Sequence, residues 1–153
     1  MAKNLVISKI QNGTVIDHIP AGEVFKVVRI LDLTEPKGTI SIAVNVDSRK
    51  YGKKDILKTE GRKLNDREIN KIAIVAPNAT VNTIKNAKVV KKTQVKIPNV
   101  LVDIIKCPNP ACITNNEEEA KSKFYVVAED PLVLKCAYCN TEITREEAIA
   151  NFK

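Results

Sequence analysis

The four cysteines are the residues of this chain whose type and spacing most clearly indicate a chemical role. They form two hooks, Cys107 to Cys112 with four residues between and Cys136 to Cys139 with two, and 23 residues separate the hooks. A tetrahedral zinc ion takes four soft donors that converge on one point, and each hook supplies two thiolates from one turn. Because cysteine fills all four positions, the spacing predicts a closed, structural Zn²⁺ site with one ion per chain.

The alternatives to a metal site are two disulfides or four buried free thiols. The amino terminus runs from Met1 straight into a strand-like pattern without the apolar core of a secretion signal, and no apolar run approaches the roughly 20 residues of a membrane span. We therefore expect a cytoplasmic protein with no membrane contact. A reducing cytoplasm disfavours disulfides, and the paired spacing disfavours unrelated free thiols.

The rest of the sequence offers little for catalysis. The five glycines never form the G-x-G-x-x-G or P-loop pattern that cradles phosphate groups. The single histidine, His18, follows Asp17 on a segment that we expect to be extended, where neighbouring side chains point to opposite faces unless a bulge re-aims one. No cysteine is left over as a nucleophile. We expect a chain that is not an enzyme.

The net charge of the chain changes sign at Pro98. Residues 1–97 carry 19 Lys and Arg against nine Asp and Glu, a net of +10, whereas residues 98–153 carry six against nine, a net of −3. All four cysteines lie in the second part. Two properties that change at one point predict a domain boundary, with a basic domain at 1–97 and a cysteine domain at 98–153.

The basic excess indicates an anionic partner. One hypothesis is a nucleic-acid-binding zinc-ribbon protein, but binding to a phosphate backbone requires a basic surface and the cysteine domain is acidic. Single-stranded nucleic acid stacks on aromatic side chains, and the chain has only three Tyr, three Phe and no Trp. A compact polyphosphate suits the basic domain better, so we expect no nucleic-acid partner.

Hydrophobic patterns predict the elements that would position these residues. In the basic domain they predict strand, helix, strand, strand, helix and strand with extra strand at both ends, which is the split βαβ or ferredoxin-like plan. Asn65 with Glu68 forms a capping box, and a strand with one buried face is expected where Ile40, Ile42, Val44 and Val46 alternate with polar and small residues. The expected segments are 5–7, 14–19, 20–31, 39–46, 56–58, 66–76, 79–84 and 87–90.

For residues 98–153 the patterns predict a small zinc-ribbon-like β domain. Strands at 124–127 and 132–135 would bring the two hooks together, and Thr144 with Glu147 forms a second capping box at the start of a short helix. The expected fold class is α+β, with a ferredoxin-like amino-terminal domain and a zinc-ribbon-like carboxy-terminal β domain.

Three segments, together with the cysteines, resemble a known family. They are Gly-Thr-Val-Ile-Asp-His-Ile-Pro at 13–20, Gly-Lys-Lys-Asp-Ile-Leu-Lys at 52–58 and Ala-Pro-Asn-Ala-Thr-Val-Asn at 76–82. In order and spacing they closely resemble the regulatory chain of aspartate carbamoyltransferase across nearly the whole length. The resemblance implies a non-catalytic subunit of pyrimidine biosynthesis. Its first domain would bind CTP, ATP or UTP effectors without hydrolysing them, and its zinc domain would hold the catalytic chain.

The resemblance also implies a homodimer of regulatory chains, formed through the first domain. By motif position, Asp17 would face the ribose, and His18 and Lys92 would face the phosphates. The full implied nucleotide site is Ile10, Asp17, His18, Lys58, Ala87, Val89 and Lys92, in which Lys58 would lie near the base and ribose, and Ile10, Ala87 and Val89 would line the base slot. The implied zinc ligands are Cys107, Cys112, Cys136 and Cys139.

Overall fold

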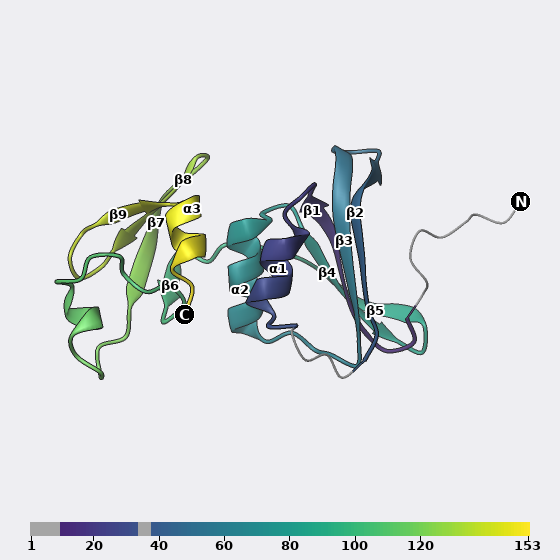
Figure 1. Ribbon diagram of the computed structural model, residues 1–153, viewed down its shortest axis with the longest axis horizontal. Helices are drawn as coiled ribbons and strands as arrows, with labels where there is room; N and C mark the ends of the chain where they lie inside the picture. The colour runs from purple at the N-terminus through teal and green to yellow at the C-terminus, as the bar shows by residue number, and fades with distance from the viewer. Residues whose placement is uncertain (1–9, 34–37) are drawn as a thin grey trace, which may run out of the picture. The chain divides into compact units, whose positions relative to one another are not determined.

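The computed structural model describes residues 10–33 and 38–153 and divides the chain into two compact units, Met1–Val95 and Lys96–Lys153 (Figure 1). The strand expected at 5–7 lies outside the described residues. Within the described ranges, no helix has the length and apolar character needed to cross a bilayer.

As far as its residues are described, the first unit is one sheet with two helices on one of its faces (Figure 1). Its five strands run in the order β2-β3-β1-β4-β5, and every neighbouring pair is antiparallel. The order β2-β3-β1-β4, with a helix after β1 and after β3, is the predicted ferredoxin-like plan, and β5 extends the sheet beyond β4. The elements are β1 (Gly13–Pro20), α1 (Val24–Ile30), β2 (Ile40–Ser48), β3 (Gly52–Glu60), α2 (Asp66–Val75), β4 (Thr80–Lys85) and β5 (Lys88–Gln94).

The two helices of the first unit begin differently. The predicted capping box of α2 is confirmed, because the Asn65 side chain accepts a hydrogen bond from the Glu68 backbone N–H at 2.8 Å and the Glu68 carboxylate accepts one from the Asn65 N–H at 3.1 Å. The expectation that α1 begins at Pro20 is wrong. Pro20 ends β1, and α1 begins at Val24 after a short turn.

The strand β1 contains a bulge at the Asp17-His18 pair. Ile16 and Ile19 are both fully buried, and between their cross-strand pairs Asp17 and His18 together stand opposite the single residue Ile56. His18 takes a left-handed backbone conformation with φ of 61°, which is uncommon for a residue other than glycine. The bulge therefore re-aims one of two neighbouring side chains that a regular strand would point to opposite faces.

A second bulge, in β2, overturns the expectation of one buried apolar face on that strand. Val44 and Asn45 together stand opposite the single residue Asp55, so the alternation reverses at this point. Ile42 is 40% exposed and Val44 41% exposed, whereas Ala43 between them is buried. Because β2 is an edge strand, its apolar side chains are only partly covered.

The second unit is a four-stranded antiparallel sheet in the order β6-β7-β8-β9, followed by a short helix that packs on β8 and β9. Its core contains Leu101, Phe124, Leu134 and Ile143, all almost fully buried. The predicted small β domain and the Thr144-Glu147 capping box are confirmed. The elements are β6 (Val100–Val102), the 3₁₀ turn η1 (Ile113–Asn115), β7 (Lys123–Glu129), β8 (Leu132–Cys136), β9 (Glu142–Thr144) and α3 (Arg145–Ala150).

Candidate functional site

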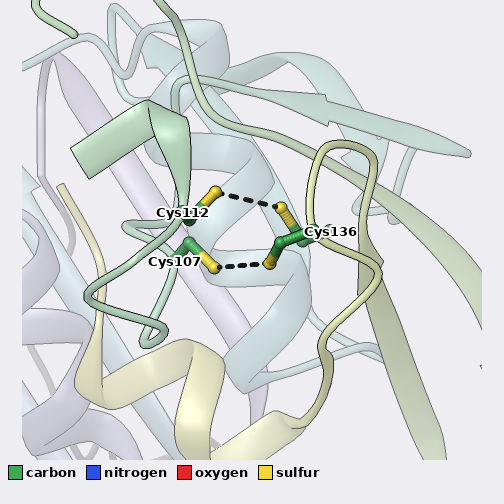
Figure 2. Close-up of side chains that lie close together, drawn as sticks. Cys107, Cys112 and Cys136 are labelled. Atoms are coloured by element: carbon green, nitrogen blue, oxygen red, sulfur yellow. Dashed lines mark hydrogen bonds between the residues drawn. The ribbon is translucent and has the colours of Figure 1, made fainter. Parts of the chain in front are cut away.

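The four cysteine sulfur atoms of the second unit converge on one point. The Sγ atoms of Cys107 and Cys139 are 3.6 Å apart, those of Cys112 and Cys136 are 3.8 Å apart, and all four lie within 4.8 Å of one another. Figure 2 shows the thiols of Cys107, Cys112 and Cys136 turned toward a common centre. A disulfide would require a separation of about 2.05 Å, so the four thiols are free. Four sulfurs at about 2.3 Å from a tetrahedral metal would be about 3.8 Å apart, which fits these spacings.

Local hydrogen bonds hold the first cysteine hook in shape. The Asn115 side-chain amide donates to the carbonyl oxygens of Cys107 and Asn109, each at 2.8 Å. The Asn116 side-chain amide donates to the Cys112 carbonyl oxygen at 2.9 Å. The η1 turn that follows the hook therefore fixes the loop from which two of the four sulfurs project.

The surroundings of the cluster affect the ionisation of its thiols in different directions. Burial raises the pKa of the Cys107 and Cys136 thiols, whereas a side-chain hydrogen bond with Thr141 lowers the pKa of Cys139. Buried thiols ionise only where a positive charge compensates the loss of solvent. Four soft donors in a tetrahedral arrangement, with no position left for a substrate, fit Zn²⁺ in a structural site.

The first unit contains a pocket of about 390 Å³ on the face of the sheet opposite the helices. Alternate residues of β1, β3 and β4 point into it, while the residues between them pack against α1 and α2. The pocket is lined by Ile10, Val15, Asp17, Ile56, Lys58, Asn82, Ile84, Ala87 and Val89.

A row of directly paired residues crosses the sheet at this pocket. Val15 of β1 pairs with Lys58 on one side and with Asn82 on the other, and Asn82 pairs in turn with Lys92 of β5. Directly paired residues share a face of the sheet, so two lysines stand in one row with Val15 and Asn82 between them. The Asn82 Oδ1 atom is buried and has no hydrogen-bond partner within the part of the chain that the structure describes.

The β1 bulge forms one end of this face. The Lys54 ammonium lies 2.9 Å from the Asp17 carboxylate, which also accepts a hydrogen bond from the His18 backbone N–H at 2.6 Å. The His18 Nδ1 atom lies 3.5 Å from the Thr80 hydroxyl, and its ring meets Tyr51 edge-on with 5.9 Å between centroids. These side chains bring imidazole, ammonium, hydroxyl and carboxylate groups together at the carboxyl end of β1.

The structure brings together most of the nucleotide residues expected from the sequence. Five of the seven line the pocket, namely Ile10, Asp17, Lys58, Ala87 and Val89. His18 and Lys92 do not line it. His18 lies at the adjacent bulge, and Lys92 is an exposed residue on the same cross-strand row as Lys58.

Sequence reasoning missed four lining residues, which are Val15, Ile56, Asn82 and Ile84. The sequence pattern that could have identified them is the period of two along a strand, by which alternate residues share a face. Val15 precedes Asp17 by two positions, and Ile56 precedes Lys58 by two. Asn82 ends the motif at 76–82, and Ile84 follows it by two.

These features define a class of protein: a binding protein that joins a pocket-bearing ferredoxin-like domain to a small metal-binding β domain. Comparison with known proteins gives the particular family. Residues 5–96 match the aspartate carbamoyltransferase regulatory chain, allosteric domain, and residues 99–149 match its metal binding domain. The chain belongs to the family of aspartate carbamoyltransferase regulatory chains.

Curated relatives agree over nearly the full length. The chain is 50% identical to the aspartate carbamoyltransferase regulatory chain of Thermococcus kodakarensis, covering 99% of both chains. It is 51% identical to that of Pyrococcus horikoshii, over 96% of this chain and 97% of the relative, and 48% identical to that of Sulfolobus acidocaldarius, over 97% and 91%. A regulatory chain is a non-catalytic subunit, so the expectation that this chain is not an enzyme is confirmed.

Proposed function

We propose that this chain binds nucleoside triphosphates such as CTP, ATP and UTP in the pocket of its first unit, without hydrolysing them. The bound effector would regulate a catalytic chain of aspartate carbamoyltransferase, in the cytoplasm, and thereby control pyrimidine biosynthesis. The observation that carries this proposal is the cross-strand row Lys58-Val15-Asn82-Lys92 at the pocket. It combines two cations with an amide that has a free acceptor, which suits a polar base joined to an anionic chain.

The two ends of the pocket suit different parts of a nucleotide. The β4-β5 turn, with Ala87 and Val89, offers apolar surface and backbone groups to a base. Toward the β1 bulge, the Asp17 carboxylate is placed to accept hydrogen bonds from ribose hydroxyl groups. His18 and Lys92 are placed to donate hydrogen bonds to phosphate oxygens. The Asp17 carboxylate is already paired with the Lys54 ammonium and with the His18 backbone N–H, so it is a poor activator of water, which agrees with binding without hydrolysis.

The second unit would hold one structural Zn²⁺ ion and dock on the catalytic chain. Ile113, directly after Cys112, is 52% exposed, and Tyr138, between Cys136 and Cys139, is 50% exposed. Large apolar side chains exposed beside a rigid metal centre are suited to contact another protein. The unit's acidic charge favours a protein partner over nucleic acid.

The first unit would also pair with a second copy of itself through β2. The edge strand β2 presents Ile42 and Val44 to solvent, whereas the opposite edge, β5, carries three lysines in seven residues. Charged edges resist strand pairing and apolar edges favour it. A twofold axis beside β2 would join two sheets into one homodimer.

The test is to co-express the chain with a candidate catalytic chain, determine the size of the assembly, and measure aspartate kinetics with and without nucleotides. We expect a mixed assembly whose aspartate response shifts with CTP or ATP, while calorimetry on the isolated chain shows binding without release of phosphate. Absence of both nucleotide binding and assembly would refute the proposal.

A further inference from the structure

Asp55 of β3 is a fully buried carboxylate, 0% exposed, that joins three segments of the first unit. One oxygen, Oδ2, accepts hydrogen bonds from the backbone N–H groups of Gly22 at 2.8 Å and Val24 at 3.1 Å, and the other, Oδ1, accepts one from Asn45 at 2.8 Å. A carboxylate without solvent is costly unless hydrogen bonds compensate it, and three backbone donors do so here. The side chain therefore has a specific structural task.

Asp55 stands beside both bulges of the sheet. Its cross-strand partner is Ile19, the residue that resumes regular pairing after the Asp17-His18 bulge of β1. On its other side it faces the β2 bulge, and the Asn45 N–H that it binds belongs to that bulge. One side chain thus fixes the chain on both sides of β3.

The carboxylate also caps α1 from outside the helix. Glu23, at the N-cap position, makes no side-chain capping hydrogen bond, and Asp55 accepts from the Val24 N–H instead. Two interactions therefore hold the chain between His18 and α1 in place. Strand pairing holds Ile19, and hydrogen bonds to the Asp55 carboxylate hold Gly22 and Val24.

The backbone at His18 requires such an anchor. A non-glycine residue at φ of 61° is strained, and strained residues persist where the surrounding structure holds them. We propose that Asp55 is a positioning residue for the phosphate end of the pocket. It holds the carboxyl end of β1 so that Asp17 and His18 face the ligand, and this inference rests on the proposed nucleotide-binding function.

The first test compares ligands that differ only in their phosphates. In Asp55→Asn the side chain keeps its shape, but the amide nitrogen cannot accept, so at least one of the three N–H groups loses its partner. We expect the affinity for CTP to fall about tenfold, the cost of one charge-assisted contact, with the affinity for cytidine changed little. Titrations of the full chain by NMR, at a temperature where wild type and variant are folded, measure both.

Leu57→Ala is the matched control. Leu57 lies on β3 two residues from Asp55, is fully buried, and pairs in regular register with Ile16 and Ile42, outside both bulges. Leu57→Ala should lower the free energy of unfolding of the first unit, while the ratio of CTP to cytidine affinity stays at the wild-type value. An unchanged ratio in Asp55→Asn would overturn the inference. A wild-type chain that binds neither ligand would refute the proposed function itself.

A second measurement needs no variant and decides the question if Asp55→Asn does not fold. In the wild-type chain, the amides of Gly22, Val24 and Asn45 should gain protection from hydrogen exchange with CTP and not with saturating cytidine. Equal protection by both ligands would show that Asp55 is not linked to the phosphate end.

Discussion

At the scale of single residues, the proposed nucleotide site depends on which side chains share one side of the sheet. Lys58 and Lys92 are 34 positions apart in sequence, yet strand pairing sets them in one cross-strand row with Val15 and Asn82 between them. Between them, the buried Asn82 Oδ1 accepts no hydrogen bond within the described residues. A ligand that donates to this oxygen would remove the cost of an unsatisfied buried group.

Lys58→Met should weaken CTP binding about tenfold, because the substitution keeps the apolar stem and removes one cation beside an anionic ligand. Calorimetric titration of CTP into the purified chain measures the change. Lys63→Met is the control, since Lys63 lines a separate crevice near the start of α2 and should leave the affinity unchanged. Equal losses in the two variants would indicate a general charge effect and contradict a specific role for Lys58.

The residue types of the site were partly predictable from the sequence, and the reason differs between the two units. The cysteine hooks are local patterns in which a turn sets the geometry, so spacing alone indicates a metal cluster. The pocket instead depends on pairing across four strands. The position of Asn82 beside Lys58 and Lys92 depends on its register with Val15, which no local pattern fixes.

At the scale of elements, local and long-range interactions determine different helix starts. The start of α2 is encoded within four residues by Asn65 and Glu68, whereas α1 is capped by Asp55 from 31 positions away. This explains why the sequence predicted the first residue of α2 and misplaced that of α1. The edge position of β2 likewise follows from the strand order and not from a local pattern, and so the exposure of Ile42 and Val44 was not predictable either.

Asn65→Ala should destabilise the first unit by about 1 kcal/mol, because the cap satisfies a backbone N–H that would otherwise lose its partner. Thermal unfolding followed by circular dichroism measures the loss. Asn70→Ala, the same substitution within α2, should be neutral or slightly stabilising, since alanine has the higher helix propensity. A comparable loss in both variants would contradict a capping role.

At the scale of the whole molecule, the two units have separable tasks, each with its own source of stability. The first has a large sheet and two helices, whereas the second has a small core beside four cysteines. Small domains commonly depend on a metal to fold.

Removal of metal with a chelator, or Cys112→Ser, should unfold the second unit and abolish assembly with the catalytic chain, while CTP still binds the first unit. NMR spectra report the two units separately, and size analysis reports assembly. Addition of Zn²⁺ after chelation should restore folding and assembly of the wild-type chain, but not of the Cys112→Ser variant. Normal assembly after chelation would show that the cluster has no structural role.

Ile42→Lys should convert the proposed homodimer to a monomer, because a charge on the apolar edge opposes strand pairing. Analytical ultracentrifugation of the isolated chain measures the mass. Val90→Lys places the same charge on the opposite edge strand, where Val90 is also exposed, and should leave the dimer intact. Dissociation by Val90→Lys alone would assign pairing to β5.

The alternation of β1 has a consequence for how such chains diversify. Val15 and Asp17 line the pocket, while Thr14 and Ile16, the residues next to them, are buried on the helix side. If the pocket binds the effector as proposed, a mutation on the outer side would change which effector a lineage responds to without disturbing the scaffold behind it. Descendants of one ancestor can acquire different regulatory preferences while they keep the same architecture.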